Sequence, residues 1–216
     1  MQTIRNRSLT PGWGATVNRE RAAPTSDVDG ELIARFLAGD RAAFDSLFAK
    51  YQDYVYNIVF GIVGKSDEAH DVAQEVFVQV YRSLGSFRRG SRFATWLYRI
   101  AVNRAVDAAR ASRSWRWLPL DETLRATPDT ADSPSRSAER SEEHDIVQKV
   151  LQEVPVQHRD VLVLRYFQDL SVEEIAEVLG CSTTAAKVRL HRARQHFKEK
   201  YVATFGHEYG TLESLS

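Results

Sequence analysis

A run of basic and small polar residues near the carboxyl end of the chain has the spacing of a DNA-contacting helix. An apolar stripe at helical intervals predicts its buried face, namely Ala186, Leu190, Ala193 and Phe197. The side chains placed on the opposite face or at its flanks are Thr184, Lys187, Val188, Arg189, His191 and Arg192. Arginine and lysine reach phosphates and guanine edges in the major groove, so this face predicts DNA binding. The alternative is an ordinary helical hairpin with a solvated basic face.

The residues before this helix provide a cap and a turn. Ser171 and Glu174 have the spacing of a capping box, in which each side chain accepts a hydrogen bond from a backbone N–H of the first helical turn. Gly180 supplies the turn, and Ser182 or Thr183 can cap the helix that follows. The spacing therefore predicts a helix-turn-helix.

A second basic segment, from Arg82 to Arg116, contains nine arginines and one aspartate, a net charge of +8. Aromatic residues alternate with the arginines, a pattern that suits single-stranded DNA, because bases stack on rings while cations follow the backbone. The candidate contacts are Arg88, Arg89, Ser91, Arg92, Phe93, Arg99, Asn103 and Arg104. The rings of Phe93 and Trp96 also fall at helix-core spacing, so packing is the alternative for both, and we favour it for Trp96.

A polar helix face carries Asp71, Gln74 and Glu75. The two acids are four residues apart, a like-charge spacing that costs about 0.2–0.5 kcal/mol in an isolated helix. This face could dock a basic partner, or it could be a solvated face. The spacing alone does not decide between them.

Composition excludes several classes of protein. The chain has 216 residues, 43% of them hydrophobic, with 29 basic residues balanced by 29 acidic ones. Its single cysteine, Cys181, excludes an intrachain disulfide, and no metal-ligand spacing or catalytic constellation is present. Residues 61–66 imitate half of a phosphate-binding loop but lack its first glycine and preceding strand. With no signal peptide and no apolar run long enough for a bilayer, we expect a soluble cytoplasmic protein without metal or cofactor.

The elements that must position these residues are helices. Apolar periodicity predicts one helix from 31 to 62 ended by Gly64, then helices over 67–84 and 93–111, and further helices from residue 146 onward. We therefore predict an all-α fold of two small helical domains joined by a flexible linker. The predicted boundaries are an extension (1–26), a first domain (27–111), an acidic Ser/Pro-rich linker (112–140), a second domain (141–203) and a tail (204–216).

Taken in order, these segments resemble the extracytoplasmic-function (ECF) sigma factors of bacterial RNA polymerase. The resemblance covers DEAHDVAQEVF at 67–77 and FATWLYRIAVN at 93–103. It continues through RDVLVLR at 159–165, LSVEEIAEVLG at 170–180 and RLHRAR at 189–194. One helix-turn-helix alone would be a weak signal, whereas this ordered combination is specific to the family.

The resemblance implies a promoter-specificity subunit that is not itself an enzyme. It implies that Asp71, Gln74 and Glu75 contact core RNA polymerase, whose clamp and flap regions bind such factors. It further implies that the 87–104 segment holds the melted −10 strand, that the 182–196 helix reads the −35 duplex, and that the linker follows the RNA exit path. An anti-sigma factor is a further expected partner. Two alternatives are a stand-alone helix-turn-helix regulator, with residues 30–111 as its effector or dimerisation domain, and an interaction protein that has lost DNA binding.

Overall fold

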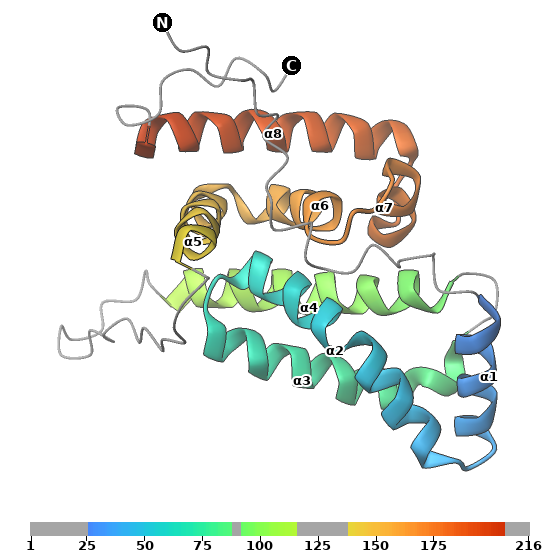
Figure 1. The fold of residues 1–216 in the computed structure, drawn as a ribbon. Helices are drawn as coiled ribbons and strands as arrows, with labels where there is room; N and C mark the ends of the chain where they lie inside the picture. Colours follow the sequence, from blue (N-terminus) through green and yellow to red (C-terminus); the bar gives the residue numbers. More distant parts are fainter. Residues whose placement is uncertain (1–25, 88–91, 116–137, 206–216) are drawn as a thin grey trace, which may run out of the picture.

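The computed structural model describes residues 26–87, 92–115 and 138–205, and no strand occurs in these ranges (Figure 1). The N-terminal half comprises α1 (Ser26–Leu37), α2 (Arg41–Val63), α3 (Ser66–Ser83), the 3₁₀ helix η1 (Leu84–Ser86) and α4 (Phe93–Trp115). The C-terminal half comprises α5 (Ala138–Glu153), α6 (Val156–Tyr166), α7 (Val172–Leu179) and α8 (Thr183–Phe205). The all-α prediction is confirmed. Several predicted features lie outside the described residues: nearly all of the extension (1–26), Arg88, Arg89, Ser91, linker residues 116–137 and tail residues 206–216.

The single helix predicted from 31 to 62 is in fact two helices. Gly39 has φ +102°, a left-handed conformation that suits glycine and ends α1. The carboxylate of Asp40 then caps α2 by accepting the N–H of Ala42 at 3.1 Å. Arg35 holds the same carboxylate from the preceding helix. Apolar periodicity runs through this turn, so it did not reveal the break.

The other predicted helix signals behave as expected. Gly64 ends α2 with φ +88°. The capping box at the start of α7 is complete, because the Ser171 hydroxyl accepts the N–H of Glu174 and the Glu174 carboxylate accepts the N–H of Ser171. Gly180 is left-handed at the end of α7, and the hydroxyl of Ser182 caps α8. The helix-turn-helix is therefore built as its local sequence predicts.

The two halves are stacked in layers (Figure 1). In the N-terminal half α2 packs against α1, α3 and α4. In the C-terminal half α8 packs against α5, α6 and α7. Helices α2 and α4 face α5, α6 and α7, so α3 and α8 lie at opposite sides of the molecule (Figure 1).

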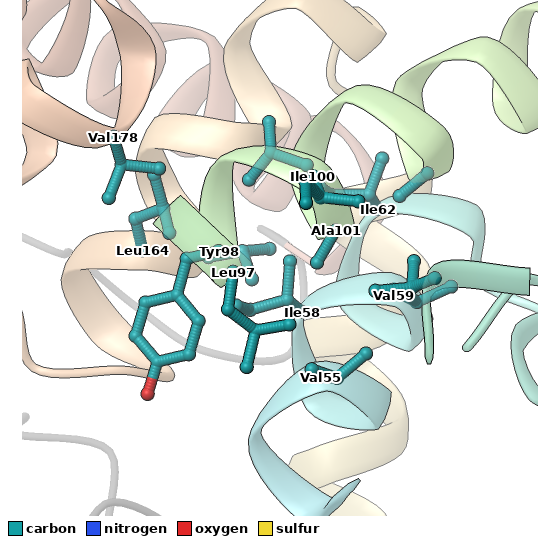
Figure 2. Packing of buried hydrophobic residues seen from close by; sticks show 14 of the residues in the cluster. Val55, Ile58, Val59, Ile62, Leu97, Tyr98, Ile100, Ala101, Leu164 and Val178 are labelled. Atoms are coloured by element: carbon teal, nitrogen blue, oxygen red, sulfur yellow. The ribbon is translucent and has the colours of Figure 1, made fainter. Parts of the chain in front are cut away.

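One hydrophobic core continues from one half into the other. Figure 2 shows Leu164 of α6 and Val178 of α7 beside Leu97, Tyr98 and Ile100 of α4. All five side chains are less than 10% exposed. The two groups of helices were predicted as domains on a linker, and here they pack against each other directly. No helix among the described residues has the length and apolar composition needed to cross a membrane.

Candidate nucleic-acid interface

The outer face of α8 presents most of the predicted duplex-binding residues to solvent. Of the predicted buried stripe, Ala186, Leu190 and Ala193 are buried and Phe197 is half-buried. The exposed side chains on the opposite face are Thr184, Lys187, Val188, His191 and Arg192. Val188 is 46% exposed, which is high for an aliphatic residue and places an apolar spot within the basic surface. Such a spot can contact the methyl group of thymine.

Arg189 differs from the other cations of α8 because it points back towards α6. Its guanidinium donates to the carbonyl of Gln157 and pairs with Asp160 at 2.5 Å. Burial raises the pKa of Asp160 to about 6, against the lowering effect of Arg189. In this conformation Arg189 supports the packing of α8 on α6. Its predicted contact with DNA would require this ion pair to break.

Three of the predicted single-strand contacts, two on α4 and one directly before it, share one face of the helix. At 100° per residue, Arg92, Arg99 and Asn103 lie within about 40° of one another around the helix. All three are exposed, and two of them contact α7, where Arg92 donates to Glu174 and Arg99 to the carbonyl of Val178. The side chain of Arg104 is about 120° away from Arg92. It donates to Gln79 Oε1 at 2.7 Å, on α3.

Phe93 is a correction to the predicted set. The ring is 5% exposed and meets Tyr51, Phe87 and Trp96 edge-on or tilted, at centroid distances of 5.4–5.8 Å. A buried ring cannot stack on a base, so its packing role has displaced the predicted contact. Trp96 joins the same cluster at 5.3 Å from Phe87, in agreement with the packing role favoured for it.

The polar face of α3 is open. Asp71, Gln74 and Glu75 are all exposed, and Val78 continues their stripe one turn further with 49% of its surface accessible. Sequence reasoning missed Val78 because an apolar residue in an amphipathic helix is normally assigned to the core. Glu75 lies 4.0 Å from Arg104, so this face borders the basic helix α4.

The described residues contain no group of three or more His, Cys, Asp or Glu side chains placed to hold a metal ion. The C-terminal half instead contains a stacked pair of imidazoles, His158 and His196, with ring centroids 4.9 Å apart. Burial lowers the pKa of His158, and the nearby positive charges of His196, Arg189 and Arg192 lower it further. This cluster lies at the inner side of α8 and was not anticipated.

Two protein families match the two halves of the chain. Sigma-70 region 2 matches residues 47–116, and Sigma-70, region 4 matches residues 144–197. The first range contains α3 and α4, and the second contains α6, α7 and most of α8. The match therefore covers both helices that carry the candidate DNA contacts.

Sigma factors of several bacteria are similar along most of the chain. RNA polymerase sigma-H factor of Pseudomonas aeruginosa is 39% identical over 183 residues, covering 79% of this chain and 92% of the relative. ECF RNA polymerase sigma factor SigW of Bacillus subtilis is 32% identical over 175 residues, covering 78% and 94%. ECF RNA polymerase sigma-E factor of Escherichia coli is 34% identical over 187 residues, covering 80% and 93%.

Two solved structures have a similar fold. CnrH, in complex with the cytosolic domain of CnrY, superposes with a TM-score of 0.61 at 26% identity, covering 85% of this chain and all of that one. The sigma factor RpoE, in complex with the anti-sigma factor NepR from Bartonella quintana, has the same fold, with a TM-score of 0.55 at 22% identity and coverage of 73% and 95%. This chain belongs to the ECF family of RNA polymerase sigma factors.

Proposed function

We propose that this sigma factor binds core RNA polymerase through the exposed face of α3 and binds promoter DNA through α4 and α8. One observation carries the proposal above the others. The polar face of α3 and the basic face of α8 are both exposed and lie on opposite sides of the molecule (Figure 1). A subunit that joins a polymerase to a promoter needs two separate surfaces of this kind.

Each proposed partner is bound by a different set of residues. Asp71, Gln74 and Glu75 contact the clamp of the polymerase, and the C-terminal half contacts its flap. Duplex DNA at the −35 element is read by the exposed residues of α8, which are Thr184, Lys187, Val188, His191 and Arg192. The melted −10 strand is held by the polar face of α4 together with residues 88–91. Binding energy drives strand opening, so the chain catalyses no reaction of its own.

The same proposal implies where the protein acts in the cell and how it is regulated. A polymerase subunit acts where the chromosome is, which is the bacterial cytoplasm. An anti-sigma factor is the expected inhibitory partner, because the similar sigma factor RpoE was solved in complex with a protein described as an anti-sigma factor. Family membership favours this function over a stand-alone helix-turn-helix regulator.

The decisive test is competition with a housekeeping sigma factor for purified core polymerase. The test variant is the triple change Asp71→Ala, Gln74→Ala and Glu75→Ala, which should weaken binding at least tenfold, equal to about 1.4 kcal/mol. A matched control exists on α2, where Asp45, Gln52 and Asp53 are also exposed and give the same change in net charge. The control triple alanine variant should bind like the wild type. Equal binding by both triple variants would exclude the α3 face, and no binding by the wild type would exclude the sigma function.

A further inference from the structure

A buried carboxylate joins the first helix of the molecule to the second. Asp29 of α1 is 4% exposed. Its two oxygens are bound by neighbouring residues of α2: Lys50 Nζ lies 2.5 Å from Oδ1, and the hydroxyl of Tyr51 donates to Oδ2 at 2.7 Å. Burial, together with the Asp29 carboxylate, raises the pKa of Tyr51, so its hydroxyl stays protonated and can donate. Helix α1, which packs against α2 and also contacts α4, is thereby fixed by one charge with two partners (Figure 1).

The Asp29 contact contributes more to orientation than to stability. Removing a carboxylate and an ammonium group from water costs much of what their attraction returns, so well-packed apolar side chains would hold α1 to α2 at least as firmly. Apolar packing is non-directional, whereas a hydrogen bond is directional. The bond from the Tyr51 hydroxyl to Asp29 therefore fixes how far the Tyr51 ring extends and how it is tilted.

The other side of the Tyr51 ring supports the start of α4. Tyr51 is 2% exposed, and its ring meets that of Phe93 edge-on at a centroid distance of 5.4 Å. Phe93 is the first residue of α4, and Tyr98, further along the same helix, lies edge-on to the Tyr51 ring at 6.5 Å. Edge-on aromatic pairs at these distances are favourable and depend on orientation. Tyr51 thus holds the N-terminal end of α4.

The contacts continue from Phe93 to a residue assigned to DNA. Phe93 meets Phe87 edge-on at 5.7 Å, and Trp96 packs on both rings at 5.3 and 5.8 Å. Arg92 directly precedes the buried Phe93, and its own side chain is exposed. Because adjacent residues share a peptide bond, a fixed Phe93 also fixes where the Arg92 side chain leaves the backbone. An unbroken series of contacts therefore leads from Asp29 to Arg92.

Support of this kind is what an exposed binding residue requires. A binding side chain works only when the residues behind it are themselves held by packing and hydrogen bonds. Here the hydrogen bond holds Tyr51, Tyr51 holds Phe93, and Phe93 holds the backbone next to Arg92. Sigma-70 region 2 begins its match at residue 47, so Asp29 lies before the part of the chain that the family model covers.

We propose that Asp29 and Tyr51 are positioning residues for capture of the −10 strand, acting through Phe93 on Arg92 and the first turn of α4; this rests on the proposed function. Neither side chain touches DNA, because both are buried. The exposed faces of α3 and α8 are formed by other residues. Loss of the Asp29–Tyr51 bond should therefore impair strand opening and leave polymerase binding and duplex binding unchanged.

Tyr51→Phe tests the proposal with little disturbance, because it removes the hydrogen bond and keeps the ring. Holoenzyme is assembled from the variant and core polymerase, on a promoter fragment that the wild-type holoenzyme has selected from random-sequence DNA. Permanganate reactivity of unpaired thymines gives the second-order rate constant of open-complex formation. That rate constant should fall about threefold or more, as expected for one lost hydrogen bond. Affinity for core polymerase, which also reports that the variant is folded, should not change.

Two changes at Asp29 separate the hydrogen bond from the charge. Asp29→Asn and Asp29→Ala both remove the negative charge, but only asparagine keeps an oxygen that can accept from Tyr51. Open-complex formation by Asp29→Asn should therefore be faster than by Asp29→Ala. Equal rates in these two variants would mean that the bond to Tyr51 has no part in strand opening, and would overturn the proposal.

A matched control joins the same two helices elsewhere. Arg35 near the end of α1 and Asp40 at the start of α2 form an ion pair of 2.6 Å at the surface. Arg35→Gln removes this pair and should leave the rate of opening unchanged. If Arg35→Gln slows opening as much as Tyr51→Phe does, any loosening of α1 has the same effect, and the positioning role is wrong.

A double-mutant cycle tests whether Tyr51 acts through Arg92. Adding Tyr51→Phe to Arg92→Ala should slow opening little further, because the group to be positioned is already absent. Adding Tyr51→Phe to Lys187→Ala on α8 should multiply the two separate effects, because these sites act independently. Independent effects of Tyr51→Phe and Arg92→Ala would overturn the proposal.

Failure of this proposal can be told apart from failure of the proposed function. A wild-type chain that binds no core polymerase would overturn the proposed function and the positioning role with it. A wild-type holoenzyme that opens the promoter no faster than the Tyr51→Phe holoenzyme would overturn the positioning role alone.

Discussion

The two helices assigned to DNA differ in what holds their arginines. On α8, Arg192 is exposed and Arg189 is paired with Asp160 in the same half of the molecule. At α4, Arg99 and the preceding Arg92 both contact α7, in the other half. The surface proposed to read duplex DNA is therefore exposed, whereas two arginines of the surface proposed to bind the single strand contact the other half.

A basic residue can form an ion pair within one half of the molecule or between the two halves, and the two kinds of pair have different effects. A pair within one half stabilises that half in every conformation and contributes to folding. A pair across the halves contributes only while the halves are packed. Substitutions on the two helices should consequently change different measured quantities.

The largest expected effect comes from Arg189→Ala. Asp160 is 3% exposed and would lose the cation that offsets its burial. Removing one partner of a buried ion pair costs about 3–5 kcal/mol, and we expect a loss near the lower limit because Arg189 is itself one-third exposed. Urea unfolding at pH 8, above the raised pKa of about 6 that Asp160 has in the wild type, measures this loss.

Arg192→Ala is the matched control on the same helix. Its side chain is exposed, so its free energy of unfolding should stay within about 0.5 kcal/mol of the wild type. Equal stability of the two variants would mean that the Arg189–Asp160 pair does not support the fold. The assignment of Arg189 to packing would then be wrong, and its predicted role on DNA would regain weight.

Arg192→Ala should instead weaken duplex binding. If Arg192 reads a base edge in the −35 element, its loss costs about 1–3 kcal/mol and relaxes selectivity at one base pair. Binding assays with a set of single-base-pair variants of the element measure both effects. An equal loss for every sequence, with a shallower salt dependence, would reassign Arg192 to a phosphate contact.

Features with a local cause were predictable from the sequence. The capping box of Ser171 and Glu174, the left-handed Gly180 and the buried Ala186 and Leu190 are all confirmed. Each depends on residues within about two helical turns, so the pattern in the sequence contains its whole cause. Apolar periodicity also located α3 and α4, although α4 continues to Trp115, beyond the predicted end at 111.

Contacts between the two halves could not be predicted from the sequence. Arg92 and Glu174 are 82 positions apart, and no pattern in either segment indicates that they meet. A glycine inside a helical pattern, such as Gly61, indicates a close approach, but nothing in the sequence says that Val163 lies opposite. Phe93 illustrates the same limit. A phenylalanine ring can stack on a base or pack in a core, and its burial here shows that it packs in the core.

The smallest expected effect is a pH dependence inside the C-terminal half. The ring nitrogen Nδ1 of His158 is buried and has no hydrogen-bond partner among the described residues, and the ring stacks on His196. The pKa of His158 is therefore lowered from 6.5 in the folded state, by burial first and then by nearby positive charge. The unfolded chain binds the proton more readily, so folding stability should fall as pH drops below 6.5 towards the lowered value.

The variant His158→Phe isolates this contribution, since it keeps a ring against His196 and removes the proton site. Asp160 acts in the opposite sense, because its raised pKa of about 6 makes the folded state gain stability as pH falls through that range, and it is present in both proteins. Denaturant unfolding between pH 8 and pH 5 should therefore show the wild type losing stability relative to His158→Phe. Parallel curves would mean that His158 takes up a proton as easily in the fold as in the unfolded chain, and that the inner side of α8 tolerates a further charge beside Arg189.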